Sequence, residues 1–412
     1  MMIKLSKLEV IDMSLNETPS SSRIHIGFFG RRNAGKSTLI NAVANQEIAV
    51  VSDVKGTTTD PVNKTMELLP LGPVLLTDTP GIDDEGELGL LRIKKAKQIL
   101  NKIHIGILVI DATEGITHFE EEIIEEFKNR NISYIVAYNK AELLHEIPPR
   151  HDNIIYVSAK NKINIDELKD TLSKIKPQTT EKRMVADFIN TGDIVVFVTP
   201  IDESAPKGRL ILPQQQAIRD TLDNSSISVV IQPQQLKHTI ETLGNSIKLV
   251  VTDSQAFGMV SKIVPEDIPL TSFSILVARV KGLLNSAVEG AAILSELKDG
   301  DCVLISEGCT HHRQCNDIGT VKLPNLIKNF TKRDINFEFT SGGTFPEDLS
   351  KYALIVHCGG CMLNENEMAY RVRFAKEQGI PITNYGTAIA HMNGILKRSV
   401  EILPELHKKL SI

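Results

Sequence analysis

The chain of 412 residues is long enough for about three domains of the usual ~150 residues. Its 42% hydrophobic and 24% charged residues are typical of a soluble globular protein. A formal net charge of −5 excludes an overall basic surface for nucleic acid, and no apolar run approaches the ~20 residues that span a bilayer. Five cysteines in so long a chain do not resemble a secreted disulfide framework. We therefore expect a cytoplasmic protein with no nucleic-acid or membrane partner and with reduced or metal-bound cysteines.

Short apolar runs predict three α/β regions in chain order. A flexible extension over residues 1–22 precedes residues 23–176, where apolar runs alternate with helical patterns, as in a parallel sheet with crossover helices. A polar linker then leads to a smaller α/β region over 183–264, and a third α/β region follows over 265–412. The strand-like runs VVFVTP and VVIQP of the middle region have few residues to cover them, which predicts a homodimer.

A phosphate-binding loop follows the first predicted strand, IHIGFF, and precedes the helical run STLINAVAN. Its segment GRRNAGKS fits G-x-x-x-x-G-K-[ST], in which backbone N–H groups wrap phosphate oxygens at a helix N-terminus. The lysine of this motif neutralises the β- and γ-phosphates, and its serine hydroxyl holds Mg²⁺. The nucleotide-binding residues expected here are Gly30, Asn33, Ala34, Gly35, Lys36, Ser37 and Thr38.

Four further motifs follow in the order found in GTP-hydrolysing proteins, which makes a chance match improbable. The run GTTTD supplies a switch threonine, Thr58, and DTPG supplies a second metal contact, Asp78, and a γ-phosphate sensor, Gly81. The remaining two motifs, NKAE and SAK, are placed where the base would bind; they contribute Asn139, Lys140, Glu142, Ser158, Ala159 and Lys160.

The order and spacing of these motifs resemble the Era/TrmE class of translation-factor-like GTPases. The resemblance implies guanine specificity, Mg²⁺ held by Ser37 and Thr58, and an activating potassium ion at Asn33. Two departures bear on activity: Glu142 stands where the class has aspartate, and no glutamine follows Gly81. We therefore expect weakened guanine preference and slow intrinsic hydrolysis. Arg31 and Arg32 are interpreted as exposed surface charges and not as an arginine finger.

A cysteine–histidine cluster near the C-terminus predicts a metal site. Cys309 and His311 form a Cys-x-His pair after the run VLIS, and His357 precedes Cys358 and Cys361 in HCGGC, after the run ALIV. If both runs are parallel strands of one sheet, the cysteines meet at its carboxyl edge. Cys361 would then lie in the first turn of the following helix, where the helix dipole stabilises a thiolate. Spacing alone supports a Cys₃His zinc site and a three-cysteine iron–sulfur cluster equally, with a redox dithiol as a third interpretation.

The two remaining cysteines are interpreted without a metal role. Cys302 lies inside the apolar run DCVLI and is expected in the core, whereas Cys315 is expected in an exposed loop.

The whole pattern resembles the HydF family of [FeFe]-hydrogenase maturation GTPases. Besides the GTPase and cysteine motifs, the stretches TPIDESAPKGRLILPQ and LTSFSILVARVKG carry this resemblance. It implies a P-loop GTPase domain at 23–176, a dimerisation domain at 183–264 and an α/β domain at 265–412 whose parallel sheet carries a [4Fe–4S] cluster. The expected cluster ligands are Cys309, Cys358 and Cys361, with His311, His357, Asp202 of the partner subunit, or water as the fourth.

The same resemblance implies a scaffold role. Such a protein binds GTP or GDP, receives a transient diiron precursor from the radical-SAM maturases HydE and HydG, and passes it to apo-[FeFe]-hydrogenase. An Era/TrmE-like GTPase that acts in ribosome or tRNA maturation, with a C-terminal zinc module, is the alternative. The third region lacks the dense Lys/Arg stripe and the clustered aromatic residues that such an RNA-binding module needs. A redox switch at Cys358 and Cys361 is a further, weaker alternative.

Overall fold

The computed structural model describes residues 18–44, 63–81, 95–176, 182–201, 210–309 and 317–410. The chain forms two compact units, Met1–Pro177 and Gln178–Ile412. None of the helices within the described residues has the length and apolar character needed to cross a membrane.

The first unit is built on one six-stranded sheet with the strand order β2-β3-β1-β4-β5-β6. Only the edge strand β2 runs antiparallel to its neighbour, and the other strand pairs are parallel. Its elements are β1 (Ile24–Phe29), α1 (Lys36–Ala44), β2 (Asn63–Leu68), β3 (Gly72–Asp78), β4 (Ile105–Asp111), α3 (His118–Asn129), β5 (Ser133–Asn139), β6 (Ile154–Tyr156) and α4 (Ile165–Lys174).

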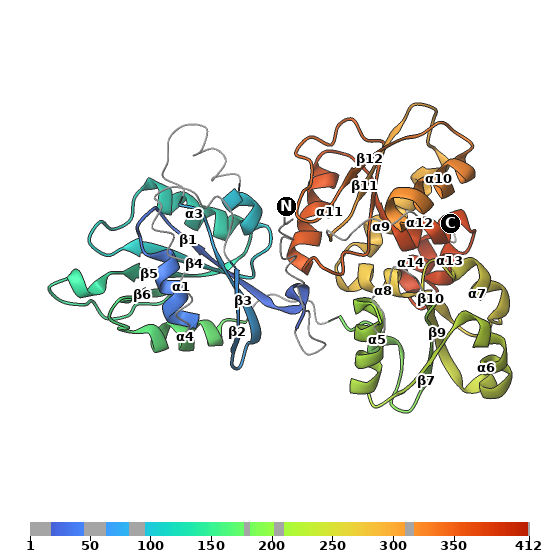
Figure 1. The fold of residues 1–412 in the computed structure, drawn as a ribbon, viewed down its shortest axis with the longest axis horizontal. Helices are drawn as coiled ribbons and strands as arrows, with labels where there is room; N and C mark the ends of the chain where they lie inside the picture. The colour runs from blue at the N-terminus through green and yellow to red at the C-terminus, as the bar shows by residue number, and fades with distance from the viewer. Residues whose placement is uncertain are drawn as a thin grey trace, which may run out of the picture. The chain divides into compact units, whose positions relative to one another are not determined.

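Helices cover both faces of this sheet (Figure 1). Leu39 of α1 and Leu168 of α4 pack with the strands on one face, whereas Phe127 of α3 packs with Phe29 on the other. Both faces of β4 are therefore buried, which explains why its sequence, IGILVID, is apolar without alternation. Part of the predicted N-terminal extension belongs to this unit, because Ser20–Ser22 form a 3-10 helix whose first carbonyl contacts the ring of His25 at 2.8 Å.

The second unit contains two four-stranded parallel sheets, with the orders β10-β9-β7-β8 and β12-β11-β13-β14. The elements of its first half are β7 (Ile194–Val198), α5 (Leu212–Asp223), β8 (Ile227–Ile231), α6 (Leu236–Leu243), β9 (Ile247–Thr252), α7 (Phe257–Ile263), β10 (Leu270–Ser272), α8 (Phe273–Val280) and α9 (Leu284–Ala292). Those of its second half are β11 (Cys302–Ser306), α10 (Leu323–Thr331), β12 (Asn336–Thr340), β13 (Leu354–His357), α11 (Glu365–Glu377), β14 (Ile382–Asn384), α12 (Tyr385–Met392), α13 (Leu396–Ser399) and α14 (Pro404–Lys409).

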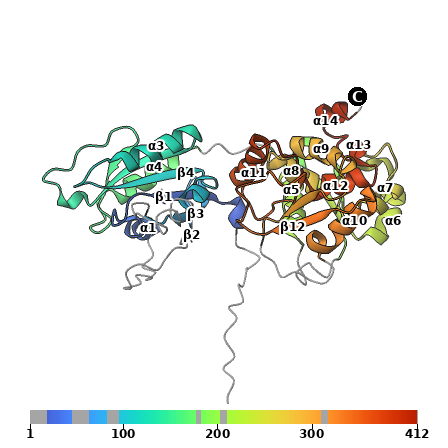
Figure 2. The ribbon, with the colours of Figure 1, turned by 90° about the horizontal axis from the view of Figure 1, so that it is seen from above.

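The helices α8 and α9 join the two sheets of the second unit into one core, and Figure 2 shows them gathered with α12. Val250 of β9, Ile275 of α8 and Ile355 of β13 belong to the same cluster of buried side chains. Polar contacts cross the same junction, since Thr383 Oγ1 donates to the carbonyl of Ala287 at 2.7 Å. The regions predicted as 183–264 and 265–412 thus share a hydrophobic core. The predicted α/β class, with a P-loop GTPase fold followed by parallel sheets, is confirmed.

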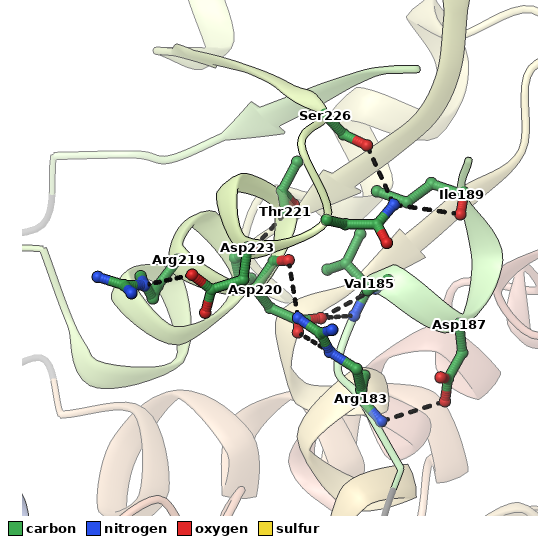
Figure 3. A network of polar contacts seen from close by, with 12 residues as sticks. Arg183, Val185, Asp187, Ile189, Arg219, Asp220, Thr221, Asp223 and Ser226 are labelled. Carbon is green, nitrogen blue, oxygen red and sulfur yellow. Dashed lines mark hydrogen bonds and ion pairs between the residues drawn. The ribbon is translucent and has the colours of Figure 1, made fainter. Parts of the chain in front are cut away.

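The start of the second unit is held by a carboxylate on α5 (Figure 3). Asp220 accepts hydrogen bonds from the backbone N–H groups of Val185 and Ala186, at 2.7 and 2.9 Å, and from Arg183 Nε at 2.7 Å. Arg279, in the last turn of α8, donates to the carbonyl of Arg183 at 2.7 Å. The first described residues after the linker are therefore fixed to two helices.

We predict that Asp220→Asn lowers the free energy of unfolding of the second unit by about 1–3 kcal/mol, because charge-assisted hydrogen bonds to a single carboxylate are lost. Urea denaturation of the full chain measures the change. Asp223→Asn, on the same helix, is the matched control: within the described residues the Asp223 side chain makes an exposed pair with Arg219 and no other, so its loss costs about 0.5 kcal/mol or less. Equal destabilisation by both substitutions would contradict this account.

Candidate functional site

The phosphate-binding loop between β1 and α1 depends on two glycines. Gly30 has φ +145°, and a Cβ atom there would lie 2.2 Å from the carbonyl oxygen of Val109. Gly35 has φ +87°, and its Cβ would lie 2.2 Å from Asn139 Nδ2. Lys36 Nζ donates to the carbonyls of Gly30 and Arg31 at 2.9 and 2.8 Å, so the ammonium lies inside the curve of the loop. This is the position from which a lysine reaches bound phosphate.

Asn139, at the end of β5, joins three of the predicted motifs. Its Nδ2 donates to the carbonyl of Ala34 at 2.9 Å, and its Oδ1 accepts from the N–H of Ala159 at 3.0 Å. The buried side chain thus ties the phosphate loop to the NKAE and SAK motifs. The next residue, Lys140, is left-handed (φ 65°) and pairs with Asp111 at the end of β4. Burial opposes ionisation of Asp111, but hydrogen bonds from Lys140 and Thr113 lower the pKa of its carboxyl group.

The two predicted Mg²⁺ contacts that lie in the described residues are adjacent. The Ser37 hydroxyl donates to the carboxylate of Asp78, and the second oxygen of Asp78 is buried without a hydrogen-bond partner among the described residues. Burial raises the pKa of Asp78, although Ser37 and Lys36 oppose this shift. A hydroxyl and a partly unsatisfied carboxylate are oxygen ligands that suit Mg²⁺, so these residues fit the ion.

The remaining residues predicted to bind the nucleotide differ in burial and backbone conformation. Glu142 also carries a buried oxygen without a partner among the described residues, which suits a carboxylate that accepts hydrogen bonds from a base. Gly81 lies against the backbone of Arg32, beside the phosphate loop. Thr38 and Lys160 are exposed, Ser158 is buried, and Asn33 is left-handed with φ 61°. Thr58 lies outside the described residues.

Arg31 corrects one expectation of the sequence analysis. It is not an exposed surface charge, because only 22% of its side chain is accessible and it pairs with Glu120 at 2.8 Å and Glu114 at 3.0 Å. Glu120 is itself buried at the start of α3, where it also accepts from the N–H of Thr117 at 2.8 Å. Arg31 therefore anchors the phosphate loop to α3. Arg32 is exposed, as expected.

The cysteine site is organised by the direct parallel pairing of β11 with β13. Ser306 is the register partner of His357, and the N–H of Cys358 donates to the carbonyl of Ser306 at 2.8 Å. The N–H groups of Gly308 and Gly360 in turn donate to Cys358 Sγ at 3.0 and 3.4 Å. The predicted meeting of the two cysteine segments at the carboxyl edge of one sheet is therefore correct.

The three thiols at this edge share one electrostatic environment. Burial, together with the neighbouring Cys358 and Cys361, raises the pKa of Cys309 to about 12. Burial likewise raises the pKa of Cys358 to about 11, against the hydrogen bonds from Gly308 and Gly360. Cys302, at the opposite end of β11, is half-buried against the core. Within the described residues, no group of three or more His, Cys, Asp or Glu side chains is arranged to hold a metal ion.

The position of Cys361 corrects a second expectation. It lies in a turn after β13 and not in the first turn of α11, which begins at Glu365 with Asn364 as its N-cap. Gly360, with φ +66°, allows the chain to bend there, and a Cβ at this residue would lie 2.7 Å from the sulfur of Met368. The turn therefore positions the Cys361 thiol, which lies outside the first turn of α11.

His357 is already engaged and is not placed as a cluster ligand, which corrects a third expectation. Arg371 Nη1 lies 2.9 Å from His357 Nε2, and because arginine only donates, Nε2 is the acceptor. The other ring nitrogen, Nδ1, then carries the proton and donates to the carbonyl of Cys358 at 2.8 Å. Burial and the nearby guanidinium lower the pKa of His357 to about 3. The other two candidates for the fourth ligand, His311 and Asp202, lie outside the described residues, as does Cys315.

Arg371 is a buried residue that the sequence analysis missed. Its guanidinium also donates to Glu367 Oε1 at 3.0 Å, to Ser306 Oγ at 3.3 Å and to the carbonyl of Gly342 at 2.9 Å. The group therefore connects β11, β13 and α11 directly behind Cys358. In the sequence, Glu367 and Arg371 look like an i,i+4 ion pair on a helix, and such pairs usually lie at the protein surface. The one signal of a different role was that Arg371 follows the cysteine motif by only a few helical turns.

Family models match most of the chain. The model for the hydrogen maturase F dimerization domain matches residues 184–282, the hydrogen maturase F tetramerization domain matches 285–402, and a 50S ribosome-binding GTPase model matches 25–140. The first unit is therefore a P-loop GTPase domain, and the family models identify residues 184–402 as hydrogen maturase domains. The chain belongs to the hydrogen maturase F family, HydF.

The curated relatives match little more than a third of the chain. The tRNA modification GTPase MnmE of Francisella philomiragia is 33% identical over 167 residues, which are 38% of this chain and 36% of that protein. MnmE of Francisella tularensis subsp. novicida is 36% identical over 152 residues, or 34% of this chain and 33% of that protein. The chain therefore spans about a third of the length of these curated relatives. The crystal structure of Aquifex aeolicus Era bound to GDP·AlF4⁻ matches with 22% identity and a TM-score of 0.33, over 53% of this chain and 98% of that chain.

We predict that Arg371→Met lowers the free energy of unfolding of the second unit by about 3–5 kcal/mol, because it leaves the buried carboxylate of Glu367 without its cation. Urea denaturation of the full chain measures the loss. The matched control is Arg373→Met on the same helix, where the pair with Glu377 is exposed, and the expected cost is about 0.5 kcal/mol or less. A loss at Arg371 no larger than that at Arg373 would contradict the proposed support of β13.

Proposed function

We propose that the chain is a GTP-hydrolysing scaffold that binds a [4Fe–4S] cluster, receives a diiron precursor from HydE and HydG, and delivers it to apo-[FeFe]-hydrogenase. One observation carries this proposal: the pairing of β11 with β13 brings Cys309 to the same sheet edge as Cys358 and Cys361, in a chain of the hydrogen maturase F family. We also propose a cytoplasmic location, because the chemistry needs reduced thiols.

The chemistry of the three cysteines supports a cluster over a single ion. A four-iron cluster is held by thiolates that bind separate irons, so its ligands are spread more widely than those of one zinc ion. The backbone N–H groups of Gly308 and Gly360 at Cys358 Sγ are the kind of donor that stabilises a bound thiolate and tunes cluster potential.

Three ligands from the protein leave one iron for an exchangeable group. When bound, the cluster supplies that iron as an attachment point for a ligand of the diiron precursor. The residues of this chain hold the thiolates in place, through the Gly308 and Gly360 N–H groups and through His357 at the Cys358 carbonyl. His311 and Asp202 of the partner subunit remain the proposed protein candidates for that fourth position.

A homodimer is proposed through the middle region. Among the described strands, the edge strand β8 has one neighbour, β7, and it exposes Ile227 by 50% and Val230 by 43%. A strand with a free hydrogen-bonding edge and apolar side chains pairs readily with a second copy of itself. The dimerization and tetramerization models matched by residues 184–402 support oligomerisation in general.

The GTPase unit is proposed to bind GTP or GDP with Mg²⁺ at Ser37, Thr58 and Asp78, and K⁺ at Asn33. Catalytic positions would be those of Lys36, Thr58, Asp78 and Gly81. The alternative function, RNA maturation in the manner of Era or TrmE, is supported by the GTPase model that matches residues 25–140 and by the MnmE relatives. Residues 184–402 match hydrogen maturase models instead, which favours the scaffold function.

We predict GTP hydrolysis of about one turnover per minute or slower, as for GTPases without a catalytic partner, and faster in potassium than in sodium. Lys36→Ala should abolish tight GTP binding, since it removes the cation inside the phosphate loop. Steady-state phosphate release and binding of a fluorescent GTP analogue measure both effects. Lys97→Ala, at an exposed lysine of the same unit, should behave as the unmodified protein. Equal rates in the two salts would remove the potassium site, and a preference for ATP would remove the guanine assignment.

We predict that Cys309→Ser, Cys358→Ser or Cys361→Ser each abolishes the [4Fe–4S] signal and hydrogenase activation, with little change in GTP hydrolysis. The test loads the purified protein anaerobically with a diiron cyanide/carbonyl complex, adds apo-hydrogenase and measures hydrogen evolution. Cys302→Ser is the matched control, because Cys302 begins β11 and so lies at the opposite edge of the sheet. If the triple cysteine variant transfers as well as the unmodified protein, the cargo does not bind at these cysteines.

A further inference from the structure

Lys281 occupies a fixed position at the end of α8, within the segment VARVKG. The N–H of Gly282 donates to the carbonyl of Arg279 at 3.2 Å, and the N–H of Leu283 donates to the carbonyl of Ala278 at 2.8 Å. These are the two hydrogen bonds of a Schellman motif, and Gly282 adopts the positive φ, +74°, that the motif requires. Lys281 is the last residue before this glycine, so its backbone is held on both sides.

The ammonium of Lys281 contacts the turn that carries Cys361. Its Nζ donates to the carbonyl of Leu363 at 2.7 Å, although the two residues are 82 positions apart in the chain. The N–H of Leu363 donates in turn to the carbonyl of Gly360 at 3.0 Å, which closes the turn around Cys361. Lys281 therefore fastens the C-terminal end of this turn to the end of α8.

Leu363 extends the effect of Lys281 to the other cysteines. A Cβ atom at Gly308 would lie 2.8 Å from Leu363 Cγ, so the leucine packs directly against Gly308. Gly308 precedes Cys309 in the chain, and its N–H is the donor to Cys358 Sγ. A displacement of Leu363 would therefore change the positions of all three cysteines.

Lys281 also brings a charge to the site. The ammonium is close enough to interact electrostatically with the Cys361 thiol and the Glu365 carboxylate. Burial removes favourable hydration of the ammonium and lowers the pKa of Lys281, and the charges of Glu365 and Cys361 offset this effect only in part. The positive charge favours a thiolate at Cys361 and any additional negative charge on a group bound there.

We propose that Lys281 is a positioning residue of the cysteine site, which fastens the Cys361 turn through Leu363 and places a fixed positive charge beside the bound cluster. The inference rests on the proposed cluster. The same contacts predict a property of the cluster-free protein as well, since the clamp on Leu363 exists without iron. Lys281 would stabilise the reduced, more negative form of the cluster, and hence raise its reduction potential.

The test compares Lys281→Met and Lys281→Arg in the full-length, cluster-loaded protein. Lys281→Met removes the donor and the charge; it should weaken iron retention against a chelator by about 10- to 100-fold, the usual effect of losing an outer-shell partner. Potentiometric EPR titration should give a more negative potential for Lys281→Met and a potential near that of the unmodified protein for Lys281→Arg. Lys262→Met, at an exposed lysine at the end of α7, is the control and should change neither quantity.

A second measurement uses cluster-free protein. Hydrogen exchange at the amides of residues 359–363 should be faster in Lys281→Met than in the unmodified protein and in Lys262→Met. Unchanged exchange, or an unchanged potential with unchanged iron retention, would overturn the role of Lys281. If Lys281→Met does not fold, Lys281→Gln, which keeps a donor without the charge, replaces it in both measurements. If the unmodified protein binds no cluster while the exchange result holds, the proposed function fails and the clamp stands.

Discussion

The parallel pairing of β11 with β13 is the constraint on which the cysteine site depends. Two segments about fifty residues apart in the chain end at the same edge because Ser306 and His357 are register partners. The pairing continues one residue further, through the N–H of Cys358 and the carbonyl of Ser306. Beyond that bond the strands separate, and the glycines that follow turn their N–H groups toward Cys358 Sγ. A shift of the β13 register by one residue would move the Cys358 thiol to the other face of the sheet.

The residues around this edge fall into a rigid side and a more adjustable side. Behind Cys358, His357 and Arg371 are fully buried and hydrogen-bonded, so the end of β13 has little freedom to move. In front, the turn from Cys358 to Leu363 has no regular structure and depends on a few contacts, among them the bond from Lys281. This combination of a buried support and an irregular turn suits a site that must hold a cluster firmly while one of its irons exchanges a ligand. In the proposed function, the buried residues would fix the position of Cys358, and the turn would leave room for the cargo.

Much of the fold follows from the sequence, because local patterns and local contacts coincide there. The phosphate loop, the α/β class of the first unit and the meeting of the cysteine segments were predicted from motifs and strand ends. A helix after the cysteine motif was also predicted; it is present as α11, although it begins only at Glu365. By contrast, α8 was not recognised: Phe273 and the run Ile275–Ala278 are all buried, so its sequence shows no amphipathic period. A helix packed between two sheets is apolar all round, and its role in joining them is visible only in three dimensions.

The details of the two sites were less predictable, since most of them depend on contacts between separate elements of the fold. His357 was a reasonable ligand candidate by spacing, yet Arg371 occupies its second ring nitrogen. Arg31 was expected at the surface, yet Glu120 of α3 draws it inward. Cys361 was expected in a helix, yet Asn364 caps that helix three residues later. For His357 and Arg31 a tertiary partner decided the role, whereas for Cys361 a local helix cap did.

The central claim is that the three cysteines at the end of β11 and after β13 hold one four-iron cluster. Mössbauer spectroscopy of the full-length protein, loaded with ⁵⁷Fe under anaerobic conditions, tests it most directly. The account predicts the spectrum of a [4Fe–4S] cluster, with one iron site distinguishable from the other three because it lacks a cysteine ligand. Mononuclear iron, a two-iron cluster, or a protein that holds zinc and no cluster would contradict it.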